Sequence, residues 1–539
     1  MLDSTTNRGE QCWLSVCGEP EHDHHQSVVT NTNMPPIKQP PTMRQKLIKE
    51  ISDLLKERSK TRIEKLYKAA ITGLEDYLEE IYNMQRESEM YSELLTSLPV
   101  QIFRDISCEV FRKVIDTISK CDDNFRESGC STYDKQYETV CRDMVRSVLC
   151  PSIRHYFTPC TWSSIPQRLV IENFDYLLNL TVLVFNMKSN IDNSAILASN
   201  IHHLKKLMIF EYICHCSDQV VKQLGLHCHN LSRIRIAYSE GVTDLSVPYL
   251  QKLTKLSYVN ISETSISTQL YQVLLTDLSG IRNIDVAENH IHILDDLVTE
   301  NLKKITHYSG LIKTVTILTE KCPNVTSVRL IRVNLDLSNL TVLTRLVKLK
   351  IEHSDYEMCN LQAVFNGVGY RLDKLILINV ENVNICDIIM KCSNVKNLIT
   401  ESCIYVPVPE NKVFHPATPH FGSVTNLRIY HNPSDVTMYN KHLRYYANLT
   451  NFYCAGIKIL SDDIFIEAVQ LGGLRNLEIL HVSELNDRQL TRRTIDILLH
   501  SCANLKILGY LETWNVSEDD ISFLEDRIIN ENLDLKILI

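Results

Sequence analysis

The sequence predicts an α/β solenoid, a curved stack of short strands and return segments, preceded by a small all-helical region. Two observations support this prediction. A short apolar motif recurs at intervals of 21 to 30 residues through most of the chain, whereas an earlier region has apolar residues at helical spacing. A chain of 539 residues is also too long for one ordinary core, so several domains or a repeat array are expected.

The first two segments differ in periodicity. Residues 1–42 are predicted to be a disordered leader, because they lack apolar periodicity and collect Asn, Thr, Pro and His. Residues 43–165 are predicted to be helical. Apolar residues recur there at three- and four-residue steps over 63–81, and two further apolar stretches follow at 98–118 and 137–157.

From residue 166 to residue 539 the sequence repeats the motif Leu-x-x-Leu-x-Leu, in which Ile, Val or an aromatic residue can replace Leu. A period near 25 residues with this motif is typical of leucine-rich repeats. Three copies are imperfect, since His307 and Thr400 occupy the last apolar position of theirs and the final copy is incomplete. The copies open at Leu180, Leu204, Leu231, Leu256, Ile281, Leu302, Val325, Leu346, Leu372, Val395, Val424, Leu449, Leu477, Leu505 and Leu535.

The spacing within the motif predicts the local structure. The second and third apolar positions are two residues apart, so they point to the same side of a short strand and the residues between them point to solvent. Each return segment is long enough for a helix, and apolar residues over 385–389 and 495–499 have helical spacing. Over 247–250 the proline would tolerate only the first turn of a helix. Stacked strands at about 4.8 Å would line the concave wall of a horseshoe about 70 Å long.

The repeats resemble the ribonuclease-inhibitor-like and cysteine-containing leucine-rich repeats. The cysteine-containing form is carried by Cys-x-Asn directly before a strand, at Cys228, Cys322, Cys392 and Cys502. Equivalent positions three or four repeats apart are separated by about 15–20 Å, whereas a disulfide needs Cα atoms within about 7 Å. These cysteines are therefore predicted to be buried free thiols.

Two segments of the helical region resemble an F-box, the module that docks substrate receptors onto cullin-type ubiquitin ligases. Leu98-Pro99-Val100-Gln101-Ile102-Phe103 resembles the opening of the motif, and residues 140–145 resemble its later Val-Cys-Arg stretch, without the usual tryptophan near Met144. The resemblance implies that Leu98, Pro99, Ile102 and Phe103 contact the F-box-binding adaptor. Generic helix packing is the alternative explanation of both segments.

The solvent-facing strand positions are predicted to form the partner-binding surface, because the concave wall is the usual binding surface of solenoids. Cations gather there although the chain has a formal net charge of -9, which suggests an acidic or phosphorylated protein partner. A solvated charged face is the alternative. The residues assigned to this surface are Arg233, Arg235, Lys304, Arg329, Lys348, Lys350, Lys374, Arg428 and Tyr453.

Catalytic, metal and cofactor sites are not predicted. Gly367 and Gly369 form a Gly-x-Gly without a third glycine, and no Walker motif, nucleophile elbow or His-Glu-x-x-His helix occurs. Cysteines and histidines over 12–25 and over 214–229 fit no strong zinc template. The negative net charge argues against general nucleic-acid binding, and no apolar run is long enough for a membrane span.

An intracellular location, cytoplasmic or nuclear, is expected. The polar start of the chain does not read as a secretory signal, and 18 cysteines without one are most simply reduced thiols. The leading hypothesis is a non-enzymatic protein-interaction module that serves as a substrate receptor of a cullin-type ubiquitin ligase. The alternative is a scaffold or inhibitor without a ligase link, in which the helices only cap the first repeat.

Overall fold

The computed structural model describes residues 149–158, 165–185, 192–406, 422–430, 446–456, 460–483 and 489–538, together with helical positions 111, 115, 118, 141, 142, 145, 146 and 443. All of these belong to one compact unit, Leu78–Ile539. The predicted leader and most of the predicted helical region lie outside the described residues.

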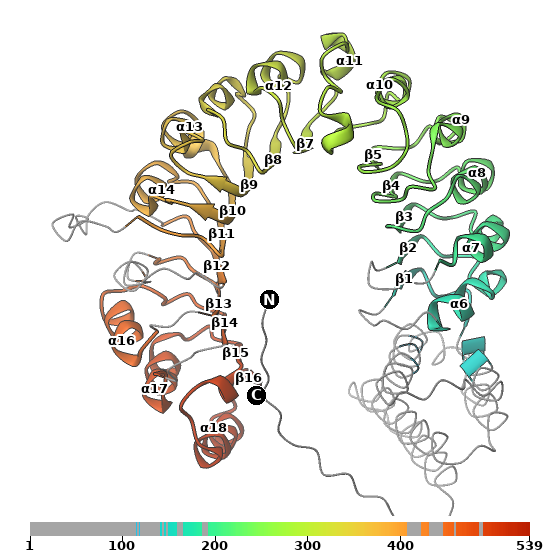
Figure 1. The fold of residues 1–539 in the computed structure, drawn as a ribbon. Helices are drawn as coiled ribbons and strands as arrows, with labels where there is room; N and C mark the ends of the chain where they lie inside the picture. Colours follow the sequence, from blue (N-terminus) through green and yellow to red (C-terminus); the bar gives the residue numbers. More distant parts are fainter. Residues whose placement is uncertain are drawn as a thin grey trace, which may run out of the picture. The chain divides into compact units, whose positions relative to one another are not determined.

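Short parallel strands follow one another in sequence order and form two sheets (Figure 1). The first sheet contains β1 (His155–Phe157), β2 (Val182–Phe185), β3 (Ile209–Tyr212), β4 (Arg233–Arg235) and β5 (Tyr258–Asn260). The second contains β6 (Asn283–Val286), β7 (His307–Gly310), β8 (Ser327–Ile331), β9 (Lys348–Asp355), β10 (Lys374–Glu381), β11 (Asn397–Glu401), β12 (Asn426–Tyr430), β13 (Asn451–Ala455), β14 (Ile479–Ser483), β15 (Ile507–Gly509) and β16 (Lys536–Leu538).

Burial alternates along the strands, as the motif predicts. In β9, Leu349 and Ile351 are buried while Lys348 and Lys350 are at least partly exposed. Leu349 lies opposite Val328 of β8 and Leu375 of β10, so the buried positions form continuous rows from repeat to repeat. The predicted α/β architecture of parallel strands that alternate with return segments is therefore confirmed over the described part of the chain.

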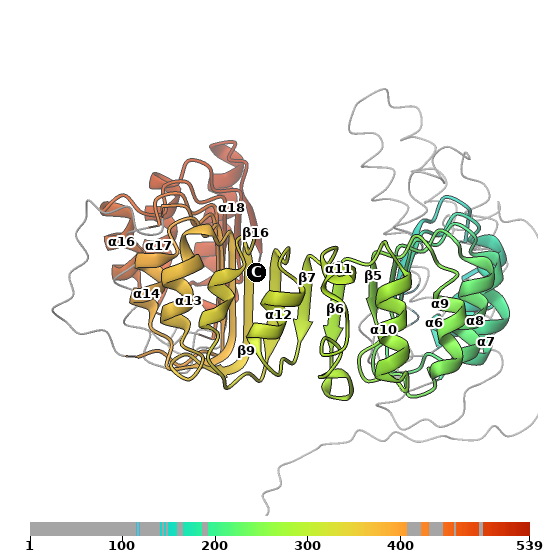
Figure 2. The same cartoon turned by 90° about the horizontal axis from the view of Figure 1, so that it is seen from above.

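Helical segments lie on one side of the strands (Figures 1 and 2). The predicted helices over 385–389 and 495–499 are present, and the proline-containing segment 247–250 forms a single short helix. The α-helices are α6 (Ile165–Ile171), α7 (Ser194–Asn200), α8 (Asp218–His227), α9 (Val247–Leu250), α10 (Thr268–Asp277), α11 (Thr299–Leu302), α12 (Val315–Lys321), α13 (Leu361–Val368), α14 (Ile385–Lys391), α16 (Asp462–Gln470), α17 (Arg492–Ser501) and α18 (Glu518–Asn530). The 3-10 helices are η1 (Phe174–Tyr176), η2 (Ile201–His203), η3 (Asp244–Ser246), η4 (Glu288–His290), η5 (Ser338–Val342), η6 (Gly369–Arg371) and η8 (Leu511–Thr513).

Two of the predicted repeat registers are wrong by three residues. In the repeat assigned to Leu204, the strand residue opposite Leu183 is Phe210, so the motif opens at Leu207. In the repeat assigned to Leu302, Tyr308 lies opposite Val328. That motif therefore opens at Ile305, and a tyrosine fills the buried position.

The repeat assigned to Leu535 is wrong by one residue, because Leu508 pairs with Ile537 rather than with Leu538. Thr400, by contrast, occupies the buried position expected of it. A polar residue in that row is tolerated when its hydroxyl finds a partner.

The strand array begins earlier than residue 166. β1 pairs with β2 at Tyr156 and Leu183, inside the segment expected to be helical. Helical residues that precede β1 pack against this end of the array. The ring of Phe111 lies 5.8 Å from that of Tyr156, and Arg146 Nε donates to Asn173 Oδ1 at 2.9 Å. The described helical residues therefore cover the first repeat.

The Cys-x-Asn residues join each repeat to the one before it. The Cys228 thiol is buried and donates to the carbonyl of Leu204 at 3.4 Å, and burial raises its pKa to about 12. Two residues later, the Asn230 amide donates to the carbonyl of Lys205 at 3.1 Å. Cys228, Cys322, Cys392 and Cys502 are all free and buried, as predicted.

A second periodicity was not visible in the sequence. In eight of the described repeats the residue two positions after the last buried strand position adopts a left-handed conformation, which non-glycine residues seldom do. The residue after it is usually buried, as at Ser239, Thr264, Ser354 and Cys403. The left-handed turn therefore directs one more side chain per repeat into the core. These turns occur at Cys214, Tyr238, Glu263, Arg332, His353, Asn379, Ser402 and Gly456, with φ between 49° and 74°.

Side chains replace part of the backbone ladder between β5 and β6. The Asn283 side chain accepts from the Val259 amide at 3.0 Å and donates to the Val259 carbonyl at 3.1 Å. On β6, the Tyr271 hydroxyl of α10 contacts both the amide and the carbonyl of Asp285 at 3.4 Å. This junction, which we call the Asn283 wedge, separates the two sheets at the residues where a ladder would otherwise continue.

Candidate interaction surface

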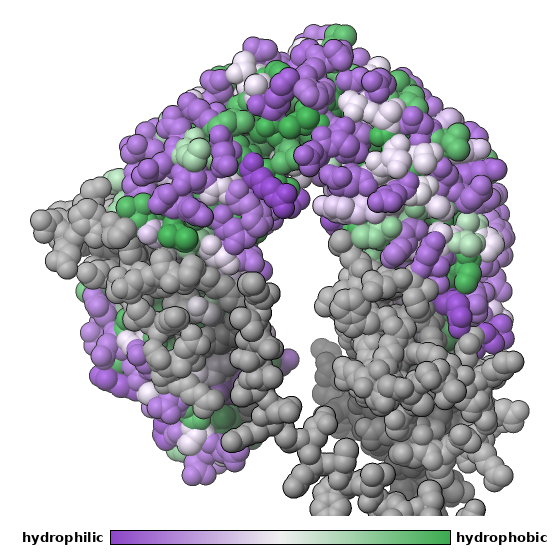
Figure 3. Space-filling model, viewed as in Figure 1, coloured by the Kyte–Doolittle hydropathy of each residue, from purple (hydrophilic) through white to green (hydrophobic). Residues whose placement is uncertain are grey.

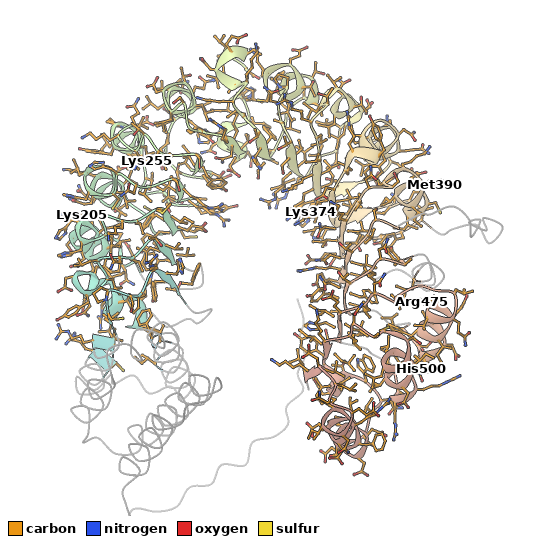
Figure 4. All side chains as sticks on the ribbon, turned by 180° about the vertical axis from the view of Figure 1, so that it is seen from behind. Lys205, Lys255, Lys374, Met390, Arg475 and His500 are labelled. Atoms are coloured by element: carbon orange, nitrogen blue, oxygen red, sulfur yellow. The ribbon has the colours of Figure 1, made fainter. Side chains whose placement is uncertain are left out.

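The solvent-facing positions of the strands, opposite the helices, form a surface that we call the strand face. Backbone pairing places successive residues of one row at neighbouring strands, for example Ser309, Arg329 and Lys350 on β7, β8 and β9. Figure 4 shows Lys374 projecting on the strand side, whereas Met390, Arg475 and His500 lie on the helix side. In the view of Figure 3 most of the described surface is hydrophilic, with a hydrophobic region beside α12, β7 and β8.

Two cations on the strand face pair with one buried carboxylate. Arg329 contacts Glu352 through Nε at 2.7 Å and Nη2 at 3.0 Å, and Lys350 Nζ lies 2.6 Å from Glu352 Oε1. The Glu352 side chain is 9% exposed, so these contacts are largely shielded from water. Although burial acts in the opposite direction, hydrogen bonds from Arg329 and Lys350 hold the pKa of Glu352 below its ordinary value. Glu352 is thus a fixed anion that orients two cations.

Lys348 and Lys374 extend this group without an acidic partner of their own among the described residues. The two lysines lie opposite each other on β9 and β10, as do Lys350 and Arg329 on β9 and β8. Burial and the charge of Lys348 both lower the pKa of the neighbouring His307. We call Arg329, Lys348, Lys350 and Lys374, with Glu352, the basic cluster. The four cations outnumber the two carboxylates that interact with them, Glu352 and the buried Asp285 beside Arg329, so the cluster has a net positive charge.

The first sheet has a smaller cationic group. Arg233 Nε lies 3.0 Å from Glu211 Oε1, and Arg235 Nη1 lies 3.8 Å from Glu211 Oε2. The Arg233 guanidinium also stacks 4.1 Å from the centroid of the Tyr258 ring. Glu211 neutralises half of the charge of this pair, so the two arginines attract an acidic partner less strongly than the basic cluster does.

Aromatic side chains follow on β13, on β14 and in the turn after β15, beside Arg428 of β12. The Arg428 guanidinium lies 4.6 Å from the Tyr453 ring centroid, and the Tyr453 ring meets that of His481 edge-on at 5.0 Å. The His481 ring meets that of Tyr510 in the same way at 5.4 Å. A Cβ atom at Gly509 would come within 2.9 Å of the His481 ring, so the lack of a side chain there makes room for it. We call Arg428, Tyr453, His481 and Tyr510 the aromatic cluster.

Three isoleucines lie between the basic and aromatic clusters. Ile376 and Ile399 occupy the same row as Lys350 and Arg428, and Ile378 lies in the next row. All three are half-buried, whereas Leu375 and Leu377 beside them are fully buried. We call Ile376, Ile378 and Ile399 the aliphatic strip. Apolar side chains at solvent-facing strand positions can bind an apolar partner at no cost in unpaired polar groups.

Most of the predicted partner-binding residues lie on this face. Arg233 and Arg235 belong to β4, Arg329 to β8, Lys348 and Lys350 to β9, Lys374 to β10, Arg428 to β12 and Tyr453 to β13. Lys304 was placed on this face wrongly. Because the register is shifted by three residues, Lys304 precedes β7, and its Nζ donates to the Leu278 carbonyl at 2.9 Å.

The remaining predicted residues are not tested by the structure or are placed elsewhere. Leu98, Pro99, Ile102 and Phe103 lie outside the described residues, as do the cysteines and histidines over 12–25. Among the described residues, no three or more His, Cys, Asp or Glu side chains are grouped so that they could hold a metal ion. Nor is any helix in that part of the chain long and apolar enough to cross a membrane.

Sequence reasoning missed the aliphatic strip, His481 and Tyr510. The strip lies within an unbroken run, Leu375-Ile376-Leu377-Ile378, in which every residue reads as core. The spacing of the motif was the available signal, because it assigns Ile376 and Ile378 to the solvent-facing row. Tyr510 was assigned to a buried position of the repeat that opens at Leu505. The structure instead places it in a left-handed turn after β15, where it is 40% exposed.

No protein-family model matches the chain, and no similar curated protein was found. Among solved structures, an internalin from Listeria monocytogenes is similar with 12% identity and a TM-score of 0.33, over 80% of this chain and 96% of that one. A leucine-rich-repeat protein of Leptospira interrogans has 13% identity and a TM-score of 0.31, over 76% and 93% of the two chains.

A chain of the yeast complex of Rad7 and Elc1 has 16% identity and a TM-score of 0.37, over 66% of this chain and 89% of that one. All three TM-scores are below 0.5, and we transfer no function from these proteins. The assignment of a repeat fold depends on the strand register and burial of this chain itself.

Proposed function

We propose that this chain is a protein-recognition module whose strand face binds a partner with acidic or phosphorylated groups. The main observation that supports this proposal is the basic cluster. Lys348 and Lys374 face solvent on neighbouring strands and, among the described residues, no carboxylate forms an ion pair with either. A chain with a formal net charge of -9 that keeps like charges adjacent gives up stability there, which binding of an anionic group would recover.

The cluster suits phosphate or carboxylate recognition in two ways. Arg329 is held in a fixed orientation by Glu352, so its remaining donors are pre-organised. Lys348 and Lys374 supply charge that steers an acidic partner toward the surface, an effect that salt weakens. The proposed function therefore predicts fast association at low ionic strength.

Charge reversal at Lys348 and Lys374 tests this function. Reversal at Arg329 or Lys350 is less informative, because it would leave the buried Glu352 carboxylate without one of its partners. We expect Lys348→Glu with Lys374→Glu to lose the acidic partners that co-purify with the unaltered chain from cells. A matched control is Lys205→Glu with Arg475→Glu, which changes the net charge equally on the helix side (Figure 4). Equal recovery of the same partners by both double variants would contradict the proposal.

We further propose that the partner is a ubiquitin-ligase substrate and that residues 43–165 recruit the ligase adaptor. The support is the F-box-like sequence at Leu98–Phe103 and over 140–145. A pulldown of the intact chain should contain the F-box-binding adaptor, and Leu98→Ala with Ile102→Ala should remove it. An intact chain that brings down its acidic partners but no adaptor would leave the binding function and eliminate the ligase role.

One observation favours the alternative, a scaffold or inhibitor without a ligase link. Cys141 and Val145 are buried, and Arg142 lies 3.8 Å from Glu172 of the first repeat. The later F-box-like segment therefore packs on the strand array, as a structural cap would. Pulldowns of the intact chain separate the two roles. A scaffold would recover its acidic partners without the adaptor. A ligase receptor would recover both, and Leu98→Ala with Ile102→Ala would remove only the adaptor.

We also propose that the chain acts inside the cell. The Asn-x-Ser and Asn-x-Thr triplets at Asn230 and Asn324 would be glycosylation acceptors in a secreted protein. Repeat stacking explains these asparagines instead, because both side-chain amides donate to the carbonyl of a preceding repeat, at 3.1 and 2.9 Å. The Ser232 and Thr326 hydroxyls that complete these triplets also donate to preceding-repeat carbonyls, each at 3.1 Å. Detection of glycans on Asn230 or Asn324 of the cellular protein would show that this location is wrong.

A further inference from the structure

The geometry points to a specific class of partner, an extended peptide segment that runs across β9 to β14 with its acidic, aliphatic and aromatic groups in that order. This inference rests on the proposed function and narrows it. It follows from three chemically different groups of side chains that occur in a fixed sequence along one row of the strand face. The row consists of Lys350, Ile376, Ile399, Arg428, Tyr453 and His481.

The acidic end of the segment would lie over the basic cluster. Lys350 and Arg329 are fixed by Glu352, and Lys348 and Lys374 lie in the adjacent row. A phosphate or a pair of carboxylates could therefore contact cations from three neighbouring strands. A single carboxylate would meet fewer of them, so a doubly charged group should bind more tightly.

The middle of the segment would lie over the aliphatic strip. The side chains of Ile376, Ile378 and Ile399 have no polar atoms. The neighbouring leucines on the same strands are buried on the opposite side of the sheet and keep these strands in place. Charged residues adjoin the strip in the next row, with Glu352 and Glu401 opposite Ile378 on the two neighbouring strands. An apolar side chain over the strip gains contact area with the three isoleucines, whereas a polar or charged side chain there would lose water to apolar surface.

The aromatic end would lie over Tyr453 and His481. Tyr453 is half-buried, its ring meets that of His481 edge-on, and the Arg428 guanidinium lies 4.6 Å from its centroid. Among the described residues, His481 Nε2 is shielded from solvent and has no hydrogen-bond partner. Burial also lowers the pKa of His481, so its ring favours the neutral form and apolar contact. A Tyr, Trp or Phe side chain suits this environment.

The spacing between strands predicts how many residues of the peptide separate its acidic, aliphatic and aromatic groups. Neighbouring strands lie about 4.8 Å apart and an extended chain rises about 3.3 Å per residue, so one strand corresponds to about one and a half residues. The aliphatic residue should therefore follow the acidic group by about three positions, and the aromatic residue by about six. Side-chain contacts of this kind are compatible with either direction of the peptide backbone, and in both the aliphatic residue lies in the middle.

A single-stranded nucleic acid is the competing occupant, because cations and stacked rings also bind phosphates and bases. The strand face favours a peptide instead. The aliphatic strip offers a base neither a hydrogen bond nor an aromatic ring, and Glu401 in the adjoining row repels a phosphate backbone. The net charge of -9 opposes such binding as well.

The test is selection of a random 12-residue peptide library, displayed on phage, against the immobilised full chain. The expected result is an enriched motif with acidic residues at one end, a branched aliphatic residue about three positions away and an aromatic residue about six positions away. A synthetic peptide of this motif, measured by fluorescence polarisation, should bind at least about tenfold more weakly to Lys374→Glu, Ile399→Asp and Tyr453→Ala. Lys205→Glu on the helix side should bind as the unaltered chain does.

Three results would overturn the inference. The first is a set of enriched peptides that lack acidic residues or that place the aromatic residue between the acidic and aliphatic ones. The second is a uridine 20-mer that binds saturably and displaces the peptide. The third is the absence of any enriched motif while binding of cellular partners still depends on Lys348 and Lys374, which would mean that the partner presents a folded surface and that only the proposed function survives. Because Ile399→Asp could affect folding, each variant is compared at equal thermal stability, and Tyr453→Ala provides an independent measurement.

Discussion

Because the Asn283 wedge joins the two sheets through a side chain, replacement of Asn283 alone should lower the free energy of unfolding of the chain. Asn283 is 4% exposed, and its side chain holds both the amide and the carbonyl of Val259 at 3.0 and 3.1 Å. In Asn283→Ala these two backbone groups lose their partners while the sheet around them stays closed. An unsatisfied buried polar group costs about 1 to 3 kcal/mol, so the loss of partners for two such groups should lower the free energy of unfolding by about 2 to 6 kcal/mol. Water that enters from the strand face would bring the loss toward the lower figure.

The assay is urea unfolding together with hydrogen exchange of peptides that contain Val259. The matched control is Asn397→Ala, which removes an asparagine from a solvent-facing position of β11, where both neighbouring strands pair through their backbones. We expect the control to change stability by less than about 0.5 kcal/mol and to leave exchange near Val259 unchanged. Exchange at Val259 should become at least about tenfold faster in Asn283→Ala. If Asn283→Ala and Asn397→Ala behave alike, the side-chain bridge does not hold the two sheets together.

Three further predictions concern the core and its hydrogen bonds. Leu349→Asp places a carboxylate in the buried row and should lower the free energy of unfolding by several kcal/mol, whereas Lys348→Asp next to it should be tolerated; equal melting temperatures would refute the register. Although burial acts against it, hydrogen bonds from Thr491 and Thr494 lower the pKa of Asp462, so its stabilising effect is complete above the unfolded pKa of about 4 and is lost as the pH falls through the folded pKa. Asp462→Asn should therefore unfold more easily at pH 7, with a difference from the unaltered chain that shrinks below about pH 4, and a constant difference would exclude this linkage. Since burial raises the pKa of Cys228 to about 12, this thiol should react with a disulfide reagent only when the chain unfolds, which the rate of modification in urea would show.

Much of the fold could be predicted because one interaction repeats. Apolar residues at fixed spacing place a buried side chain such as Leu349 or Leu375 at the same height in every repeat, and stacking then requires parallel strands. The burial of Cys228 could be predicted for the same reason. The cations of the strand face followed from the motif as well, since a residue between two buried positions must point the other way.

Register, by contrast, was ambiguous wherever apolar residues are too frequent. Leu204-x-x-Leu207-x-Ile209 and Leu207-x-x-Phe210-x-Tyr212 satisfy the motif equally well, and only pairing with β2 selects the second. The same ambiguity misplaced Lys304, because a shift of three residues moves a side chain out of the strand. When two registers fit the motif within one repeat, only the pairing with the strand of the neighbouring repeat decides between them.

The charge on a surface depends on neighbours that are distant in sequence. The sequence identifies Glu352 as the nearest counter-charge of the cations on this face without showing which of them it binds. In the structure Glu352 binds Arg329 in a bidentate contact, while Lys374 has no such partner among the described residues. The sequence by itself determined the repeat, its parallel strands and the presence of cations on one face. Only the tertiary structure decided which cations are neutralised and where apolar and aromatic groups adjoin them, because these properties arise between strands that the chain brings together from more than twenty residues apart.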